Sequence, residues 1–493
     1  MDSLPKFQLT SNDTIPNSVN DVRNAFHSQK TKPLEFRKQQ LRRLYWSIKD
    51  NYDALLAACK KDIGKGTFEA GFELEWCMND CIYVANKLNE WAKDEKAPEI
   101  PLMNAMLRPK IRNEPLGMIL IIGTYNFPLI LLFPPLIGAI AAGNTVIIKP
   151  SENAPNVAAV AERVITSTLD PSCFRVIQGA IPETTTLLDQ KWDKIFYTGG
   201  ATVGTIVAKK AAETLTPYTL ELGGKNPAIV TKNANIRKAA HRLLWGKIQN
   251  AGQVCISQNY TLVERPVLDA FVAEMKGALA EFFPSGTRNT DDYGRLVNSK
   301  QLQRAKSILD STKGKIIVGG TIDESDCYFE PTIILLDSTD DPMLQEESFA
   351  PLMPVIPFDD LNSAIATANS MESTPLGLYP FGSKVENEKI LNEIRSGGAS
   401  VNDAWIHGSI PTLAFGGVGD SGQGAYRGKA SFDCFSHRRS ITTTPWWAEK
   451  LIAMRYPPYA GKLEQFKRLG SLKPNFDRDG KVKVGLLRCV HVS

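Results

Sequence analysis

The sequence lacks the features that mark secreted or nucleic-acid-binding proteins. Its eight cysteines are scattered over 493 residues without the spacing of a disulfide framework or a zinc site, which favours a reducing compartment. The net charge of +4 is small for this length, and basic and acidic residues are interspersed, so nothing indicates a nucleic-acid partner. No repeat or low-complexity segment is visible. We therefore expect an ordinary globular protein without a metal site.

Long apolar runs are also missing. The most lipophilic stretch, residues 116–148, is interrupted by GTYNFP, by Pro134-Pro135 and by Gly143-Asn144, so it stays below the ~20 residues of a membrane helix. The N-terminal MDSLPKFQLTSND has neither a basic region before an apolar run nor an Arg-rich amphipathic pattern. We therefore expect a cytoplasmic protein that contacts a membrane at most peripherally.

The N-terminal part of the chain has helical periodicity. Residues 36–95 carry two helical patterns, and in the first of them apolar residues recur three and four apart from Leu41 to Cys59. In the second, Cys77, Cys81 and Ile82 share one apolar face. We therefore expect a helical layer in which these two cysteines pack in the core.

From residue 117 onward, short β-branched runs alternate with amphipathic segments, which is typical of βαβ units. The first series has strands in MILIIG, TVIIKP, FRVIQG and KIFYTG and helices over 129–142, 155–169 and 182–190. A second series begins with the strand NPAIV and a helix over 235–250 and continues to about residue 403. FGGVGDSGQG at 415–424 is too glycine-rich for either element and predicts a loop and a domain re-entry. The fold class is therefore α/β, with two Rossmann-like parallel sheets covered on both faces.

Cys255 is the first candidate for chemistry. In WGKIQNAGQVCISQNY, a helix of apolar periodicity ends at residues 250–252, and the cysteine lies just after the end of this helix. The thiolate is the nucleophilic form, so reactivity requires a lowered pKa or a nearby base. The alternative is a structural cysteine, which is the commoner fate of a free thiol.

Glu221 is the second candidate. It ends the apolar strand of LTPYTLELGG, directly before a Gly-Gly turn that lets the chain pass close to another segment. Burial raises the pKa of a carboxyl toward neutrality, which suits a general base that takes a proton from water. The alternative is a buried ion pair with a lysine such as Lys225.

Asn126 is the third candidate. GTYNFP at 123–128 follows an apolar strand and precedes a helix, so Asn126 projects from the carboxyl end of a parallel sheet, where α/β folds bind ligands. Its amide can donate a hydrogen bond to an oxyanion. The alternative is a simple turn or cap residue.

Two further strand ends indicate a nucleotide site. VIIKPSE ends a strand with Lys149 and Glu152, and FYTGGATVG ends another with glycines before a helix whose backbone N–H groups can hold a pyrophosphate. This loop departs from the usual G-x-G-x-x-G fingerprint. Glu152 can accept hydrogen bonds from a ribose hydroxyl and would repel a 2′-phosphate, which favours NAD over NADP.

Seven motifs, taken in order, resemble the aldehyde dehydrogenase superfamily over roughly residues 35–460: GTYNFP, KPSE, YTGGATVG, LELGGK, NAGQVC, EESFAP and the stretch from SGGASVND to FGGVGDSGQG. The short N-terminus, LTPYTLELGG, WGKIQNAGQ, FSHRR and RYPP resemble its class 3 or fatty-aldehyde branch. The resemblance implies oxidation of an aldehyde to a carboxylic acid with NAD, or with NADP, through a thiohemiacetal and a thioester.

The resemblance also implies a role for each candidate. Cys255 is the implied nucleophile, Glu221 the general base and Asn126 the oxyanion donor, helped by the Cys255 backbone N–H. The implied cofactor-binding residues are Lys149 and Glu152 at the adenosine ribose; Gly199, Gly200, Ala201, Thr202, Val203 and Gly204 at the pyrophosphate; Glu347 at the nicotinamide ribose; and Phe349 near the nicotinamide ring.

Three motifs depart from the family's usual forms. The aromatic before Asn126 is Tyr125, the G-S-T/N-x-x-G loop reads GGATVG, and EEIFGP reads EESFAP. None of these changes removes a catalytic atom. Ala201 and Ala350 bear instead on how tightly the cofactor is held, and Ser348 replaces an apolar residue beside Glu347.

The alternation of strands and helices and the resemblance to aldehyde dehydrogenases together predict the domain organisation. We expect residues 1–100 to form an N-terminal helical part of the cofactor-binding domain and 101–115 a β-hairpin for dimerisation. Residues 116–222 would form the NAD-binding Rossmann-like domain, 223–412 the catalytic domain, 413–445 a return segment with a bridging strand, and 446–493 a C-terminal tail. The implied assembly is a homodimer with C2 symmetry.

The resemblance favours hydrophobic aldehydes, which include medium or long-chain aliphatic, aromatic, and isoprenoid or apocarotenoid compounds. An enzyme that passes the thioester to coenzyme A has little use for Glu221, and a catalytically silent homologue would lack one of the three candidates. The basic C-terminal tail either contacts an anionic membrane or is simply solvated. We expect His407 and His437 to be structural.

Overall fold

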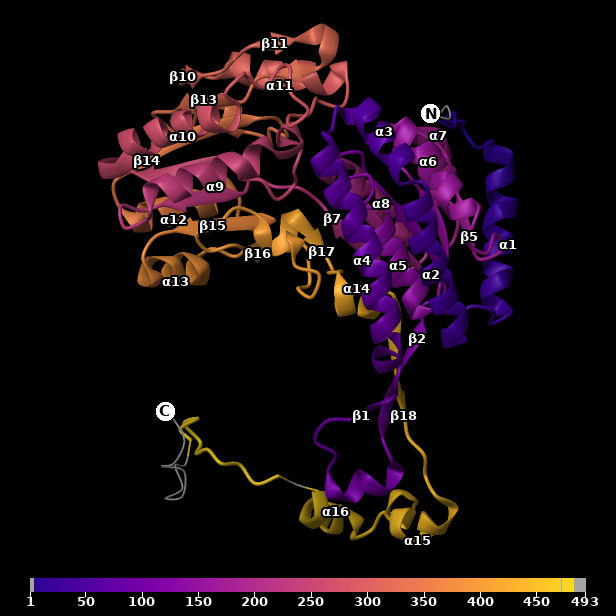
Figure 1. The fold of residues 1–493 in the computed structure, drawn as a ribbon. Helices are drawn as coiled ribbons and strands as arrows, with labels where there is room; N and C mark the ends of the chain where they lie inside the picture. Colours follow the sequence, from indigo (N-terminus) through magenta and orange to yellow (C-terminus); the bar gives the residue numbers. More distant parts are fainter. Residues whose placement is uncertain (1–3, 471, 483–493) are drawn as a thin grey trace. The chain divides into compact units, whose positions relative to one another are not determined.

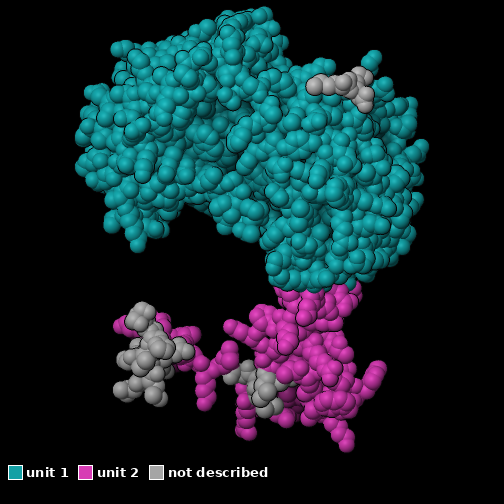
Figure 2. All heavy atoms as spheres, in the orientation of Figure 1, with its two compact units in different colours: residues 1–92, 114–437 teal, residues 93–113, 438–493 magenta. Residues whose placement is uncertain are grey.

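The computed structural model describes residues 4–470 and 472–482, which fall into two compact units. The larger unit comprises residues 1–92 and 114–437, and the smaller unit comprises residues 93–113 and 438–493 (Figure 2). All of the predicted catalytic and cofactor residues belong to the larger unit.

The larger unit contains a six-stranded sheet with the order β17-β7-β6-β3-β4-β5. Figure 1 labels its strands β17, β7 and β5 together with the helices α1 to α8. Strands β3 to β7 are parallel, and β17 at the edge pairs antiparallel with β7. The bounds are β3 Met118–Ile122, β4 Thr145–Lys149, β5 Phe174–Val176, β6 Lys194–Thr198, β7 Tyr218–Glu221 and β17 Gly422–Gln423. Through β17, the glycine-rich segment predicted as a loop returns the chain to this sheet with a short strand.

Helices cover both faces of this sheet. Ile119 and Ile121 of β3 point into one hydrophobic core, whereas Leu120 between them points into another. The first core contains residues of α2 (Leu34–Asp50), α3 (Tyr52–Ile63), α4 (Thr67–Trp91), α5 (Phe133–Ala142), α6 (Pro155–Thr166) and α14 (Gly428–Cys434). The second contains residues of α1 (Ile15–His27), α7 (Ile181–Leu188) and α8 (Ala201–Glu213). Burial on both faces explains why these strands are almost uninterrupted apolar runs.

A seven-stranded sheet with the order β10-β13-β14-β9-β8-β15-β16 completes the larger unit. All of its pairs are parallel except β10 with β13. The bounds are β8 Pro227–Val230, β9 Tyr260–Glu264, β10 Lys315–Val318, β13 Thr332–Leu335, β14 Leu352–Phe358, β15 Gly377–Phe381 and β16 Gly398–Ala399. Its helices are α9 Ile236–Ile248, α10 Leu268–Phe282, α11 Ser299–Ser311, α12 Leu361–Met371 and α13 Lys384–Glu393, and a hairpin joins β11 Ile322–Asp323 to β12 Tyr328–Phe329. The predicted α/β fold with two Rossmann-like parallel sheets is confirmed.

Several predicted helix limits were wrong for local reasons. The single pattern from Leu41 to Cys59 is two helices, α2 and α3, because Asn51 leaves the helical region between them and its side chain donates to the carbonyl of Ser47. α5 begins at Phe133 rather than residue 129, since its two prolines suit a first helical turn and not an interior one. Cys77 and Cys81 are buried as expected, but Ile82 is exposed.

The smaller unit contains a three-stranded sheet in the order β1-β2-β18. β1 (Glu95–Lys96) and β2 (Lys110–Pro115) are antiparallel and are joined through a 3-10 helix, η2 (Leu102–Leu107). The third strand is β18 (Ser436–Ile441), and the short helices η9 (Trp446–Ala448), α15 (Glu449–Ile452), η10 (Ala453–Arg455) and α16 (Lys462–Gly470) follow it. Residues 483–493 of the predicted tail lie outside the described residues. Among helices in the described ranges, none is long and apolar enough to cross a membrane.

Candidate active site

Cys255 follows a short loop at the end of α9. The 3-10 segment η3 (Gln249–Gly252) contains Asn250 and Ala251 in left-handed backbone conformation, with φ of 50° and 51°. The side chain of Gln253 ties this loop down: it donates to the carbonyls of Asn250 (3.0 Å) and Arg295 (2.9 Å) and accepts from the Val297 N–H (3.0 Å). Cys255 is therefore held on a fixed loop and remains partly exposed.

The surroundings of Cys255 disfavour its ionised form. Burial, followed by the negative charges of Glu347 and Glu221, raises the pKa of the thiol to about 12. The other described cysteines make no disulfide. The thiol of Cys255 is therefore protonated at rest.

Glu221 ends β7 and is almost completely buried. Neither of its carboxylate oxygens has a hydrogen-bond partner in the described part of the chain. Burial raises the pKa of this carboxyl well above its ordinary value. The alternative of a Lys225 ion pair is not found among the described residues, where the Lys225 backbone N–H donates to Glu372 instead.

Asn126 lies in the turn after β3 and is 2% exposed. Its amide nitrogen donates to the Gln253 carbonyl at 3.0 Å, which links the turn to the cysteine loop. An amide carries two N–H bonds, and no second acceptor is found for this one within the described ranges. One donor is therefore left for a ligand.

A cavity of about 230 Å³ brings the three candidates together with part of the predicted cofactor set. Its lining includes Asn126, Glu221, Cys255, Gly199, Gly200, Glu347 and Phe349. Thr124, Thr198, Gln301 and Arg304 also line it, and sequence reasoning missed them. Arg304 donates to the backbone carbonyls of Glu347 and Ser348, so an arginine 43 residues before Glu347 supports that loop.

The remaining predicted cofactor residues lie around two strand ends. Lys149, at the end of β4, forms an ion pair with Glu152. Gly200 precedes α8, and no side chain caps the backbone N–H groups of Ala201, Thr202 and Val203 at the start of this helix. A Cβ on Gly200 would meet no atom within 4 Å, which leaves an open cradle at a helix N-terminus, as a pyrophosphate requires.

Glu347 and Phe349 line the same cavity as Cys255. Burial raises the pKa of Glu347 to about 7, with Lys247 acting in the opposite direction. The ring of Phe349 packs edge-on against Tyr125 with centroids 6.2 Å apart. The residues present therefore fit a nicotinamide nucleotide in the cavity.

A second cavity, of about 340 Å³, is also lined by Cys255. Aromatic rings dominate its walls, namely Phe68, Phe72, Trp76, Phe127, Trp245, Trp405, Phe415 and Tyr426. Trp245 and Trp405 stack with centroids 4.8 Å apart. Cys255 thus lines both this apolar cavity and the cavity that it shares with Asn126 and Glu221, which is named the nucleotide cavity after the ligand that its residues fit. Among the described residues, no group of acidic, thiol and imidazole side chains could hold a metal.

An α/β unit with an open helix N-terminus at the end of a parallel strand and a thiol beside an apolar cavity has the features that a nicotinamide-dependent oxidoreductase requires. A model of the aldehyde dehydrogenase family matches residues 2–441. The chain belongs to this family, whose members use NAD or NADP.

The chain is similar in sequence to known relatives along nearly its whole length. The beta-apo-4'-carotenal oxygenase of Neurospora crassa is 50% identical over 484 residues, which are 98% of this chain and 91% of the relative. The enzyme named "Aldehyde dehydrogenase, dimeric NADP-preferring" from Canis lupus familiaris is 40% identical over 451 residues, 91% of this chain and 99% of the relative. The substrate-bound state of Staphylococcus aureus AldH superposes with a TM-score of 0.90 at 39% identity and covers 93% of this chain and 99% of that one.

Proposed function

We propose that this chain oxidises hydrophobic aldehydes to carboxylic acids with NAD or NADP, through a covalent intermediate on Cys255. One observation carries the proposal: Cys255 lines both the apolar cavity and the nucleotide cavity, with Glu221 and Asn126 beside it in the latter. An aldehyde bound with its chain among the aromatic rings would thus present its carbonyl to the thiol.

The Cys255 thiol first loses its proton to solvent, and addition of the resulting thiolate to the carbonyl carbon moves a pair of electrons onto the aldehyde oxygen. The free N–H of Asn126 and the backbone N–H of Cys255 are the donors proposed to stabilise that charge. One such donor is typically worth ~3 kcal/mol of transition-state stabilisation. Because the amide is already fixed by Gln253, it needs little reorganisation during the reaction.

A bound nicotinamide would supply the hydride acceptor, and Cys255 would carry a thioester once the hydride has left the former aldehyde carbon. Glu347 and Phe349 are the residues proposed to hold the nicotinamide end, and Lys149 with Glu152 the adenosine ribose. The helix start at residues 199–204 would hold the pyrophosphate. The carboxylate of Glu152 favours NAD, although the relative from the dog is named NADP-preferring.

Glu221 is proposed to take a proton from the water that hydrolyses the thioester. Its oxygens lack protein partners in the described chain, and its raised pKa gives it the basicity that this step needs. The same features count against transfer of the thioester to coenzyme A. They also count against a silent homologue, since a buried and unpaired carboxyl is costly without a use.

The walls of the apolar cavity and the name of the fungal relative both support a long, unsaturated substrate. Aromatic rings provide flat apolar surface that suits a polyene chain. The relative at 50% identity is named for an apocarotenal. We therefore propose an isoprenoid or apocarotenoid aldehyde within the hydrophobic class.

The assembly and the cellular location of the chain are also proposed. The chain is proposed to form a homodimer through the predicted hairpin at 101–115, with the domain boundaries expected from the sequence. It is proposed to be cytoplasmic, with at most peripheral membrane contact. Cell fractionation, and liposome binding before and after removal of residues 460–493, would test the location.

NADH formation at 340 nm tests the function. An apocarotenal and hexadecanal are expected to saturate the enzyme at far lower concentrations than acetaldehyde, and Cys255→Ser is expected to abolish turnover with all three. Absence of NADH or NADPH formation with every aldehyde would overturn the proposal. Preference for acetaldehyde would overturn the proposed substrate class alone.

A further inference from the structure

A fully buried lysine that the proposed reaction does not use lies beside the turn that carries Asn126. Lys65 stands in the loop before α4, and its side chain has no exposure to solvent. Burying an ammonium is costly unless charge and hydrogen-bond partners compensate it. Lys65 forms an ion pair with Glu73 of α4, donates to the backbone carbonyl of Asn126 at 3.0 Å and lies 4.2 Å from the centre of the Phe127 ring. Its three N–H donors thus have a carboxylate, a carbonyl and an aromatic face around them.

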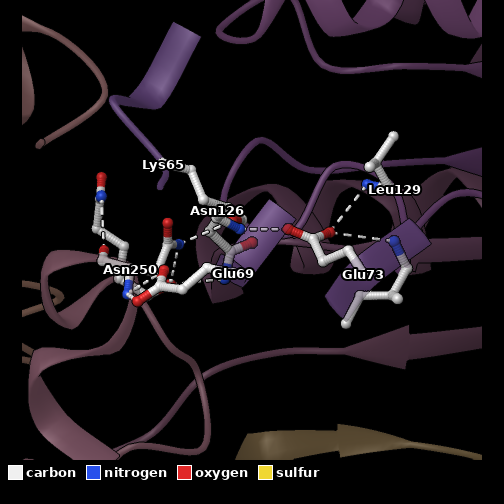
Figure 3. A network of polar contacts seen from close by, with 8 residues as sticks. Lys65, Glu69, Glu73, Asn126, Leu129 and Asn250 are labelled. Carbon is white, nitrogen blue, oxygen red and sulfur yellow. Dashed lines mark hydrogen bonds and ion pairs between the residues drawn. The ribbon is translucent and has the colours of Figure 1, made fainter. Parts of the chain in front are cut away.

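The partner of Lys65 holds the next part of the same turn. The second oxygen of Glu73 accepts hydrogen bonds from the backbone N–H groups of Leu129 (3.2 Å) and Ile130 (3.3 Å). Figure 3 shows Glu73 between Lys65 and Leu129. The ion pair therefore binds the backbone of this turn at Asn126 and again at Leu129 and Ile130, just before α5.

The carbonyl of Asn126 is also the point where the cysteine loop attaches. Asn250 donates from its side-chain amide to that carbonyl at 2.7 Å and to the Gln253 carbonyl at 3.1 Å (Figure 3). The side chain of Asn126 donates to the same Gln253 carbonyl. Lys65 and Asn250 thus share one acceptor, and Asn126 and Asn250 share another, two residues before Cys255.

α4 also contacts the cysteine loop directly. The carboxylate of Glu69, on the first turn of α4, accepts from the Asn250 backbone N–H at 3.0 Å. Asn250 has a left-handed backbone, which is uncommon for a residue other than glycine and persists where its surroundings hold it. The beginning of α4 is therefore bonded both to the turn that carries Asn126 and to the loop that carries Cys255.

We propose that the Lys65–Glu73 ion pair positions the reaction: by fixing the backbone of Asn126, it sets the distance between the Asn126 amide and the aldehyde oxygen bound at Cys255. The proposal rests on the proposed function, because it assigns Asn126 the oxyanion. Lys65 and Glu73 are positioning residues, since neither lines either of the two cavities beside Cys255. The pair adds no new step to the reaction and changes only the rate of the addition and of hydride loss.

The first test is the single-turnover rate of hydride transfer in Lys65→Met. Because a displacement of ~1 Å in a reacting group can cost ~100-fold, the rate is expected to fall by about 10- to 100-fold with little change in KM for the aldehyde. Alkylation of Cys255 by iodoacetamide needs no oxyanion donor and is expected to remain unchanged. A fall in both rates would indicate general disruption and would overturn the proposal.

Arg37→Met is the matched control. Arg37 is another buried cation, and it donates to the backbone carbonyls of Thr31, Lys32 and Ala141, away from the proposed chemistry. Its loss is expected to lower stability while the rate per folded molecule stays at the wild-type value. An Arg37→Met rate as low as that of Lys65→Met would assign the effect to stability and refute positioning.

A double-mutant cycle shows whether Lys65 acts through Asn126. Asn126→Ala alone is expected to cost about 100- to 1,000-fold, as the loss of an oxyanion donor does elsewhere. In that background, Lys65→Met is expected to cost less than about threefold, because residues that act as one unit are not additive. A full additional loss would overturn the proposal.

A second variant keeps the test decisive if Lys65→Met does not fold. Lys65→Met with Glu73→Gln removes both charges of the pair, and the amide oxygen of the glutamine can still accept from the Leu129 and Ile130 N–H groups. It is expected to fold and to show the slow hydride transfer of the single variant. A wild-type rate in this variant would refute the role of the pair and leave the proposed function intact, whereas a wild-type protein inactive on every aldehyde would refute both.

Discussion

Alkylation of Cys255 by iodoacetamide in the protein without cofactor is expected to be slow at neutral pH and to accelerate steeply in alkali. The surroundings raise the pKa of the thiol from 9.0 to about 12, with burial as the largest cause. That rise of about three pH units corresponds to about 4 kcal/mol against the thiolate. At pH 8 the folded protein therefore holds about a thousandfold less Cys255 thiolate than the unfolded chain.

The assay measures the modified Cys255 peptide by mass spectrometry at a series of pH values, with urea-unfolded protein as the reference. The rate constant is expected to rise about tenfold per pH unit up to pH 10 without levelling off, because only the thiolate reacts. Glu347→Gln removes the second-largest cause and is expected to speed alkylation. The gain should be present above pH 7 and fade below it, since the carboxyl of Glu347 has a pKa of about 7. A rate that levels off at or below pH 8 would refute this account of the thiol.

Three other outcomes follow from the site. Because burial raises the pKa of the Glu221 carboxyl, the free energy of unfolding should fall as pH rises from 4.5 through the raised pKa. Glu221→Gln cannot ionise and should therefore have a higher Tm than the wild type at pH 7. Equal Tm values would contradict this. Glu152→Gln should raise kcat/KM for NADP relative to NAD by about tenfold through loss of repulsion with the 2′-phosphate, which steady-state kinetics would reveal. Ile406→Trp should fill part of the apolar cavity and raise KM for hexadecanal while leaving acetaldehyde kinetics unchanged; equal effects on both substrates would exclude a selective wall.

The sequence allowed the fold class and the approach of Asn126 to Glu221 to be inferred because both depend on local pattern. Strand ends carry Asn126 and Glu221, and carboxyl ends of parallel strands meet at one edge of a sheet, so their approach follows from the βαβ order. The loop of Cys255 bonds to Asn126 through the Gln253 carbonyl, and only the family resemblance implied that Cys255 shares a site with Asn126 and Glu221.

The apolar cavity and the Lys65 network could not be inferred in this way. Cavity walls come from residues 68–76, 127–131, 245–256 and 405–427, and only the tertiary fold gathers these segments. Lys65 looks like an ordinary solvated lysine in GKGTFEAGFE, and its main partners are a glutamate eight residues later and a backbone carbonyl. Asn51 similarly interrupts a periodicity that predicted one continuous helix.

The central claim is that Cys255 carries the acyl group and Glu221 releases it. The most direct measurement is the intact mass of Glu221→Gln after mixing with NAD and an aldehyde, read together with the NADH formed. We expect about one NADH per molecule in a rapid burst, a mass increase equal to the acyl group on the Cys255 peptide, and a following turnover slower by about 100- to 10,000-fold. Unimpaired turnover in this variant, or an acyl group on any other residue, would contradict the claim.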